Sequence, residues 1–237
     1  MTAQFRVSTK SMMPNPVRLF HITAIDNLRA ICQRNELVSK NAGASSGINY
    51  QNIAHASIQT TRATKLVMDP PGGNIHDYVP FYFAPRSPML FTINNGNVDG
   101  CSLKQDDILH FETTVDRAIQ NNPKFVFYDR NAAIAFSEAF TDLSLLPTKI
   151  AWDLITEGPR LDGFCQYFQS VPTKEKYIDR MERRQAEFLL KDAVDLSAIT
   201  CIGVVNESKA EIVRKILTET GINMPVEVKK SWYFLGQ

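Results

Sequence analysis

The order of strand-like and helix-like segments is the feature that most constrains the fold of this chain. Short segments rich in apolar, aromatic and β-branched residues predict strands at residues 17–23, 78–83, 89–94, 108–114 and 124–129, and further strands at 186–190, 199–205, 226–230 and 232–234. Helix-type segments do not follow these strands in the regular rhythm of a parallel sheet. The sequence therefore predicts one α+β domain with a split, mainly antiparallel sheet.

Three segments have the 3.6-residue apolar period of a helix: 24–37, 131–140 and 207–220. In the first, Ile25, Leu28 and Ile31 share one face behind Asp26 or Asn27 as the capping residue. The last ends at Gly221, a typical helix stop. We expect amphipathic helices that each bury one face against the sheet.

The remaining stretches lack periodicity. Residues 1–16 are polar up to Pro14 and Pro16, which predicts a flexible N-terminal tail before a single domain at 17–237. Residues 41–76 are rich in Asn, Ser, Thr, Gly and Ala, and they predict a long loop that contains Arg62 and Lys65. The prolines of "APRSP" predict a rigid bend that presents Arg86 and Ser87.

Composition excludes several classes of protein. The 26 Lys and Arg residues balance 25 Asp and Glu residues, so no overall field attracts nucleic acid or an anionic membrane. Four separated cysteines and four separated histidines show no metal-ligand spacing, and we expect no metal. Rossmann and P-loop glycine motifs are absent. The chain also lacks a long apolar run and a signal-peptide core, which favours a cytoplasmic protein.

Glu187 is an acid within the apolar run "AEFLL". Burying a lone carboxylate in a strand costs several kcal/mol unless a cation compensates it. One explanation is an ion pair with Arg183, Arg184 or another basic group. The alternative is a strand that faces a cleft, where Glu187 stabilises positive charge that develops in a transition state. The residues alone leave both explanations open.

His21 and Thr23 alternate onto one face at the end of the first predicted strand. Both side chains can form hydrogen bonds with a ligand amide or ribose. A structural histidine at a strand edge is the competing explanation.

Several stretches taken together resemble one family. "RLFHITAIDN", "TTRAT", "HDYVPFYFAPRSPML", "FVFYDRNAA", "RRQAEFLL" and "SWYF" resemble, in order, motifs of the DarT toxins, which are DNA ADP-ribosyltransferases of bacterial toxin-antitoxin pairs. The resemblance extends from about residue 17 to residue 234. It implies an ADP-ribosyltransferase fold around a cleft for NAD as co-substrate, and transfer of ADP-ribose to a base in single-stranded DNA with release of nicotinamide.

The resemblance also implies roles for individual residues. Glu187 and Arg62 match the two catalytic groups of the family. The expected NAD contacts are His21, Ile22, Thr23, Asn27 and Tyr82. The expected DNA contacts are Lys65, Arg86, Ser87, Met89, Arg130 and Asn131.

Two features leave the target open. Many relatives have Ser-His where this chain has Arg130-Asn131, and the segment 156–177 corresponds to an irregular substrate-recognition loop. The motifs favour thymine over guanine. The competing hypotheses are an RNA or protein ADP-ribosyltransferase and a non-catalytic NAD- or nucleic-acid-binding module. A non-catalytic module is expected to lose Glu187 or Arg62, and this chain has both. The resemblance further implies a DarG-like macrodomain antitoxin as partner, and we expect a monomer.

Overall fold

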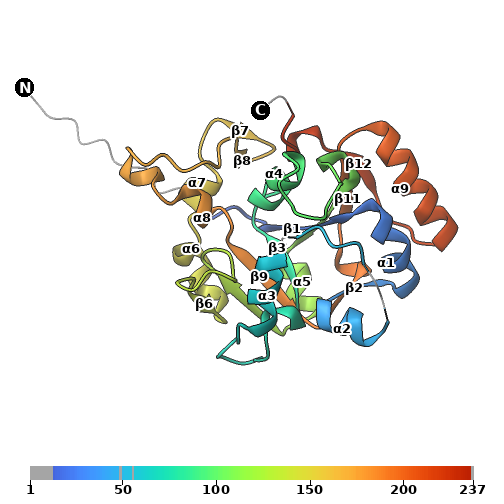
Figure 1. Ribbon diagram of the computed structural model, residues 1–237, viewed down its shortest axis with the longest axis horizontal. Coiled ribbons are helices and arrows are strands. Elements are labelled where there is room, and N and C mark those ends of the chain that lie inside the picture. The colour runs from blue at the N-terminus through green and yellow to red at the C-terminus, as the bar shows by residue number, and fades with distance from the viewer. Residues whose placement is uncertain (1–12, 48–49, 55, 236–237) are drawn as a thin grey trace, which may run out of the picture.

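The computed structural model describes residues 13–47, 50–54 and 56–235, and its centre is an eight-stranded sheet (Figure 1). The strand order is β12-β11-β4-β1-β3-β9-β5-β6. Neighbouring strands are antiparallel except β11 and β12, which are parallel. The predicted α+β class with a mainly antiparallel sheet is confirmed. The strands are β1 Arg18–Ala24, β3 Tyr78–Tyr82, β4 Ile108–Thr114, β5 Phe125–Tyr128, β6 Ala139–Phe140, β9 Glu187–Lys191, β11 Cys201–Val204 and β12 Val226–Val228.

The sheet consists of two halves that meet at one point. β1 pairs with β4 along its whole length, and β3 pairs with β9 along its whole length. β1 and β3, by contrast, share one registered residue pair, Phe20 and Tyr82. Because the two strands separate on leaving this pair, the sheet is split beside Tyr82.

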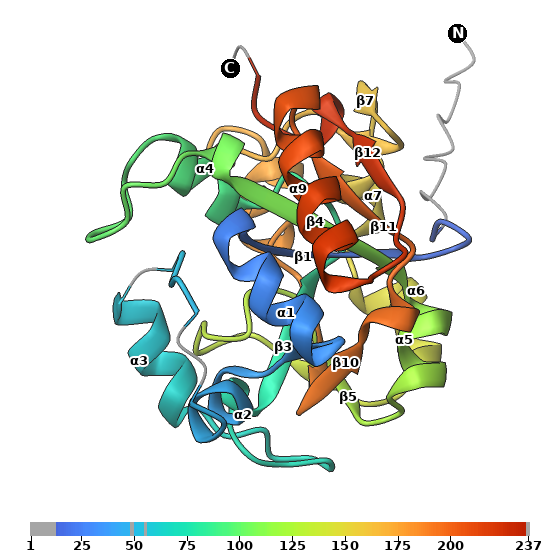
Figure 2. The ribbon, with the colours of Figure 1, turned by 90° about the vertical axis from the view of Figure 1, so that its right-hand side faces the viewer.

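Helices and two small sheets surround this centre. β2 Glu36–Val38 pairs with β10 Ala193–Asp195, and β7 Arg160–Leu161 pairs with β8 Phe164–Cys165. Figure 2 shows α1 and α9 side by side on one side of the molecule. The helices are α1 Leu28–Arg34, α2 Lys40–Ser45, α3 Ala56–Thr64, α4 Pro88–Asn94, α5 Val115–Asn121, α6 Leu146–Lys149, α7 Trp152–Ile155, α8 Arg180–Arg183 and α9 Glu207–Thr220.

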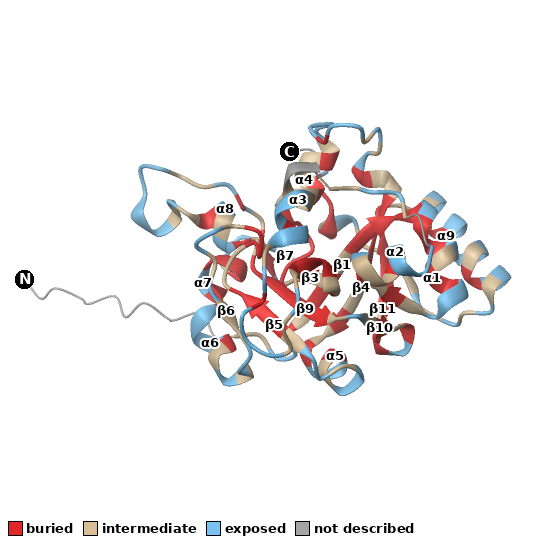
Figure 3. Cartoon of the chain, turned by 60° about the horizontal axis from the view of Figure 1, so that its bottom comes forward, coloured by how far each residue is buried: buried red, intermediate tan, exposed pale blue. Residues whose placement is uncertain are grey.

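The core occupies both faces of the sheet, whose central strands are almost wholly buried (Figure 3). Successive side chains of a strand point to opposite faces. In β9, Phe188 and Leu190 therefore enter the main core, whereas Leu189 enters a second cluster on the other face. Glu187 shares the face of Leu189.

Residues 88–94 form the helix α4, so the strand predicted at 89–94 is wrong. The Ser87 hydroxyl accepts a hydrogen bond from the Leu90 N–H at 3.2 Å, and Pro88 occupies the first turn. A capping serine followed by proline begins a helix even where the apolar pattern suits a strand.

The helix predicted at 131–140 is also wrong, since this segment consists of turns followed by β6. The N–H of Ala132 donates to the Glu187 carboxylate at 3.3 Å, and the N–H of Ala133 donates to Asn131 Oδ1 at 2.9 Å. These side chains satisfy the N–H groups locally, and the chain turns instead of continuing as a helix.

Three further boundaries differ from prediction. The predicted loop at 41–76 contains α2 and α3, and the predicted strand at 232–234 overlaps the 3-10 helix Lys230–Trp232. The predicted helix at 24–37 is shorter, because α1 ends at Arg34 and β2 follows. By contrast, α9 and its left-handed Gly221 stop, with φ of 72°, are confirmed.

The predicted tail falls mainly on residues 1–12, which lie outside the described residues. Of the rest of it, Met13 packs against the main core. Within the described ranges, no helix is both long and apolar enough to span a membrane.

Candidate active site

A cavity of about 360 Å³ lies where β1 and β3 separate. Residues of β1 and β3 form its floor, and residues of α2, α3 and the segment 50–54 form the opposite wall. This volume falls within the range of small-ligand sites. The structure brings together around it the predicted residues His21, Ile22, Thr23, Asn27, Arg62, Tyr82, Met89 and Asn131.

Glu187 begins β9 directly behind this wall and is 0% exposed. The Arg62 Nη1 group donates to both of its carboxylate oxygens, at 3.1 and 2.9 Å. The Ala132 N–H contributes a third donor at 3.3 Å. The basic partner of the buried acid is therefore Arg62, not Arg183 or Arg184.

Arg62 lies in the last turn of α3 rather than in a loop. It is 8% exposed and lines the cavity, so its guanidinium lies between the cavity and the buried Glu187. Both bonds to Glu187 come from Nη1, and among the described residues Nε and Nη2 have no hydrogen-bond partner. One guanidinium can thus hold the carboxylate and still donate to a ligand.

His21 and Tyr82 belong to the floor of the cavity. The His21 Nδ1 group donates to the Pro80 carbonyl at 2.8 Å, which leaves Nε2 as an acceptor. Burial lowers the pKa of His21, so the ring is neutral at pH 7. Burial, with the nearby Glu187 carboxylate, raises the pKa of Tyr82, which stays a neutral aromatic. Tyr82 and Glu187 are cross-strand partners.

Asn27 positions the cavity wall rather than capping a helix. Its Nδ2 donates to Thr23 Oγ1 at 3.0 Å and to the Gln51 carbonyl at 3.1 Å. Its Oδ1 accepts from the Gln51 N–H at 2.8 Å. These bonds use the whole amide, so Asn27 holds residue 51 against the end of β1 and is not a free donor.

A polar group at the α2–α3 end of the cavity has no counterpart in the sequence prediction. Lys40 Nζ donates to Gln59 Oε1 at 2.7 Å, and His76 Nε2 donates to the same oxygen at 2.9 Å. Burial, together with the charges of Lys40 and Arg62, lowers the pKa of His76 to about 4. All these residues line the cavity. Local periodicity gave no signal for them, because 41–76 has none.

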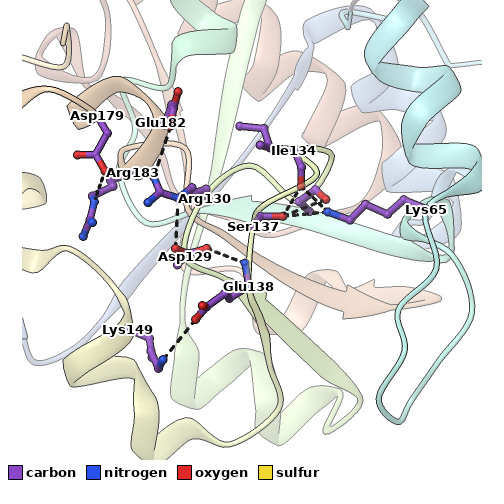
Figure 4. A network of polar contacts seen from close by, with 11 residues as sticks. Lys65, Asp129, Arg130, Ile134, Ser137, Glu138, Lys149, Asp179, Glu182 and Arg183 are labelled. Atoms are coloured by element: carbon purple, nitrogen blue, oxygen red, sulfur yellow. Dashed lines mark hydrogen bonds and ion pairs between the residues drawn. The ribbon is translucent and has the colours of Figure 1, made fainter. Parts of the chain in front are cut away.

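Two of the predicted DNA contacts are engaged within the protein (Figure 4). Lys65 Nζ donates to the Ile134 carbonyl at 2.6 Å and to Ser137 Oγ at 2.9 Å. Arg130 forms ion pairs at 3.3 to 3.4 Å with three carboxylates, those of Asp129, Asp179 and Glu182. Arg130 therefore ties β5 to the segment that leads into β9.

The predicted bend does not present Arg86 and Ser87 to solvent, because each is 1% exposed. The Arg86 guanidinium donates to the carbonyls of Ser231, Phe164 and Cys165. Ser87 caps α4. The placement inferred for these two residues is wrong, since both are buried and the terminal nitrogens of Arg86 bind backbone carbonyls.

No group of three or more His, Cys, Asp or Glu side chains in the described part of the chain is arranged to hold a metal ion. Charged and aromatic groups at the cavity include the Arg62 guanidinium, the Glu187 carboxylate behind it and the Tyr82 ring of the floor. A carboxylate fixed beside a cavity stabilises positive charge that develops on a bound substrate. Such a site suits cleavage of a bond that leaves a cationic sugar.

The family model described as "ssDNA thymidine ADP-ribosyltransferase, DarT" matches residues 20–234. The chain belongs to the DarT family. The resemblance inferred from the sequence motifs is thereby confirmed.

Relatives agree with this assignment. A DNA ADP-ribosyl transferase of Thermus sp. (strain 2.9) is 34% identical over 95% of this chain and 100% of its own length. The structure of Thermus sp. 2.9 DarT in complex with ADP-ribosylated ssDNA matches with a TM-score of 0.82 at 32% identity, covering 95% of this chain and 100% of that one.

A second complex of the same Thermus protein and one further relative are informative. The Thermus sp. 2.9 DarT complex with NAD+ matches with a TM-score of 0.77 at 31% identity, covering 93% of this chain and 99% of that one. A Thermosipho africanus protein described as a DNA ADP-ribosyl transferase-DNA ADP-ribosyl glycohydrolase fusion is 24% identical over 94% of this chain, which spans 51% of its length.

Proposed function

We propose that this DarT-family chain transfers ADP-ribose from NAD to the thymine base of single-stranded DNA, releases nicotinamide, and acts in the cytoplasm as the toxin of a toxin-antitoxin pair. The coarser part follows from family membership: the chain is an NAD-dependent DNA ADP-ribosyltransferase that acts on single-stranded DNA. Thymine is supported by the thymidine in the family description and by the sequence motifs.

The observation that carries the proposal is the buried Glu187–Arg62 pair, whose arginine lines a cavity with His21 and Tyr82 on its floor. In the reaction, the bond from ribose C1′ to the nicotinamide nitrogen breaks, and nicotinamide leaves with the electron pair. A base nitrogen then bonds to C1′ and releases its proton to solvent water. The Glu187 carboxylate stabilises the cationic ribose between these events.

The other residues take supporting roles in this proposal. Tyr82 stacks on the nicotinamide ring, and the free acceptor of His21 binds a ribose hydroxyl. Arg62 uses its unoccupied Nε and Nη2 groups to hold the acceptor base, while Nη1 keeps Glu187 in place. Met89 and Asn131 also line the cavity and are available for contacts with the base.

A DarG-like macrodomain antitoxin is the proposed partner, and the DarT chain itself is proposed to be a monomer. The fusion of a transferase with a glycohydrolase in the Thermosipho africanus relative supports a partner that removes the modification. Co-expression with such a macrodomain is expected to relieve toxicity of the wild type, and the Glu187→Ala variant is expected not to need it.

Mass spectrometry of single-stranded oligonucleotides incubated with NAD tests the proposal. A strand that contains thymine as its sole reactive base is expected to gain one ADP-ribose, whereas matched strands with guanine or uracil and a paired duplex are not. Glu187→Ala is expected to lower the rate by about 10²–10³ or more. If guanine, RNA or protein is modified and thymine is not, thymine is not the acceptor.

Arg62→Ala separates the two steps. If Arg62 holds the base, transfer to DNA is lost while slow hydrolysis of NAD to ADP-ribose continues, because water can replace the base. Lysine is expected to restore little transfer, since it lacks the planar fork. Equal loss of DNA transfer and of NAD hydrolysis would show that Arg62 acts only by holding Glu187 in place.

A further inference from the structure

We propose that Arg130 and Lys65 are positioning residues, which hold the Glu187 carboxylate in place through one turn of the chain, residues 129–137. The inference rests on the proposed function, because it relies on the role that Glu187 has there. Neither Arg130 nor Lys65 lines the cavity. Each of them therefore acts on the reaction through the residues that it binds.

Arg130 joins the turn to the start of α8 (Figure 4). Its Nη1 group lies 3.3 Å from Asp179 Oδ2 and 3.4 Å from Glu182 Oε2. Its Nε group lies 3.4 Å from Asp129 Oδ2. Even with Arg183 paired to Asp179 at 2.7 Å, these three carboxylates outnumber the two guanidinium groups. A negatively charged group repels a DNA phosphate, so Arg130 suits a link within the protein better than a contact with DNA.

Two neighbouring residues of the turn extend this link to Glu187. Asn131 Nδ2 donates to Gln185 Oε1 at 3.3 Å, and the Ala132 N–H donates to Glu187 Oε1 at 3.3 Å. The contacts thus advance in step along both segments and end on the carboxylate itself. A shift of the turn moves one of the donors that fix Glu187.

Lys65 joins the other side of the turn to α3, the helix that carries Arg62. Its Nζ group donates to the Ile134 carbonyl at 2.6 Å and to Ser137 Oγ at 2.9 Å, and Ser137 donates to the same carbonyl at 2.8 Å. The Lys65 N–H donates to the Thr61 carbonyl at 2.9 Å, so the residue continues the hydrogen bonding of the helix. The end of α3 is thereby held against the turn.

Together these bonds form a closed chain of contacts. Arg62 of α3 binds Glu187, Glu187 accepts from Ala132 of the turn, and the turn is bound by Lys65 at the end of α3. Supporting hydrogen bonds of this kind fix a reacting group to within about 0.5 Å. The closed chain keeps the carboxylate where the cationic ribose forms.

The test uses four variants of the whole chain and a control. Lys65→Met and Arg130→Met remove the charged group but keep an apolar stem, whereas Lys65→Arg and Arg130→Lys keep the charge. Lys149→Met is the matched control, because Lys149 is exposed and pairs with Glu138 directly after the turn, at 3.3 Å (Figure 4). Circular dichroism and thermal unfolding verify that each variant is folded.

Three measurements separate positioning from DNA binding. The rate of nicotinamide release from NAD without DNA reports on Glu187. Titration with a short thymidine oligonucleotide at several salt concentrations reports on DNA binding. Hydrogen exchange of residues 129–137 reports on the turn and does not depend on catalysis.

In Lys65→Met and Arg130→Met, kcat for nicotinamide release is expected to fall by roughly ten- to hundredfold, because a displacement of about 1 Å has an effect of this size. KM for NAD, the oligonucleotide affinity and its salt slope are expected to stay unchanged, while hydrogen exchange of the turn becomes faster. Lys65→Arg and Arg130→Lys are expected to recover most of the rate, and Lys149→Met to match the wild type.

Unchanged nicotinamide release in both methionine variants would overturn the proposal. If the oligonucleotide affinity falls instead, and its salt slope drops by about 0.7 for each residue, Lys65 and Arg130 bind phosphates. An equal loss of release in Lys149→Met would also overturn the proposal. A wild type that releases nicotinamide but modifies no oligonucleotide would refute the proposed function and leave this test intact.

Discussion

Replacing Arg62 by methionine gives the sharpest test of how the site is held together. Glu187 is 0% exposed, and the variant leaves its carboxylate with the Ala132 N–H, at 3.3 Å, as its remaining donor. Removing one partner of a buried ion pair costs about 3–5 kcal/mol, because the other charge stays buried without compensation. For a chain of this size, such a loss lowers the melting temperature by about 10 °C.

The companion variants give the size of the coupling. Glu187→Gln leaves Arg62 at the cavity wall, where its 8% exposure and two unpaired nitrogens allow water to solvate the charge. We expect it to cost about 1–2 kcal/mol, near the value for one lost hydrogen bond to a charge. The double variant buries no unpaired charge and is expected to be more stable than Arg62→Met alone, with a coupling energy of roughly 1.5–3 kcal/mol.

Urea unfolding at pH 7, followed by tryptophan fluorescence, measures all four stabilities. Trp232 and Trp152 are buried and report on loss of the core. The reasoning is refuted if Arg62→Met lies within about 1 kcal/mol of the wild type, or if the effects of the two single variants simply add.

Three further outcomes are expected. His21→Ala and Tyr82→Ala each weaken NAD binding by two- to tenfold or so and leave oligonucleotide binding unchanged, a result that unchanged NAD titrations of both variants would contradict. Gly203→Ala destabilises the fold by about 1–3 kcal/mol, since its Cβ would lie 2.2 Å from Trp232 Cζ3; a melting temperature equal to that of the wild type would show that the indole moves freely. Burial lowers the pKa of His110 to about 4 from 6.5, so below pH 6.5 the unfolded state binds a proton that the folded state does not. The free energy of unfolding therefore falls as the pH drops from 6.5 towards 4, by about 3 kcal/mol from this residue. Urea titrations at both pH values are expected to show a smaller fall for His110→Gln, and an unchanged fall would assign the loss to other groups.

Local pattern was sufficient for much of the fold. The short apolar runs in 108–114 and 186–190 predicted β4 and β9, because a strand that is buried on both faces has few polar residues in its own sequence. The 3.6 period and Gly221 predicted α9 for the same reason. Where a local cap competed with the apolar pattern, as at Ser87, pattern alone gave the wrong element. The segment 41–76 hid two helices, since their polar sequence gave no apolar face.

The sequence by itself identified Glu187 as an acid that needs a partner, because an apolar strand around a carboxylate is an energetic conflict visible in five residues. It also carried the family motifs that name Arg62. Only the tertiary structure decided that these two residues bind each other across 125 positions, and that Lys40, Gln59 and His76 meet beside them. Periodicity specifies which face of an element is buried, but the partner on that face is chosen by the packing of distant segments, and no local pattern encodes that choice.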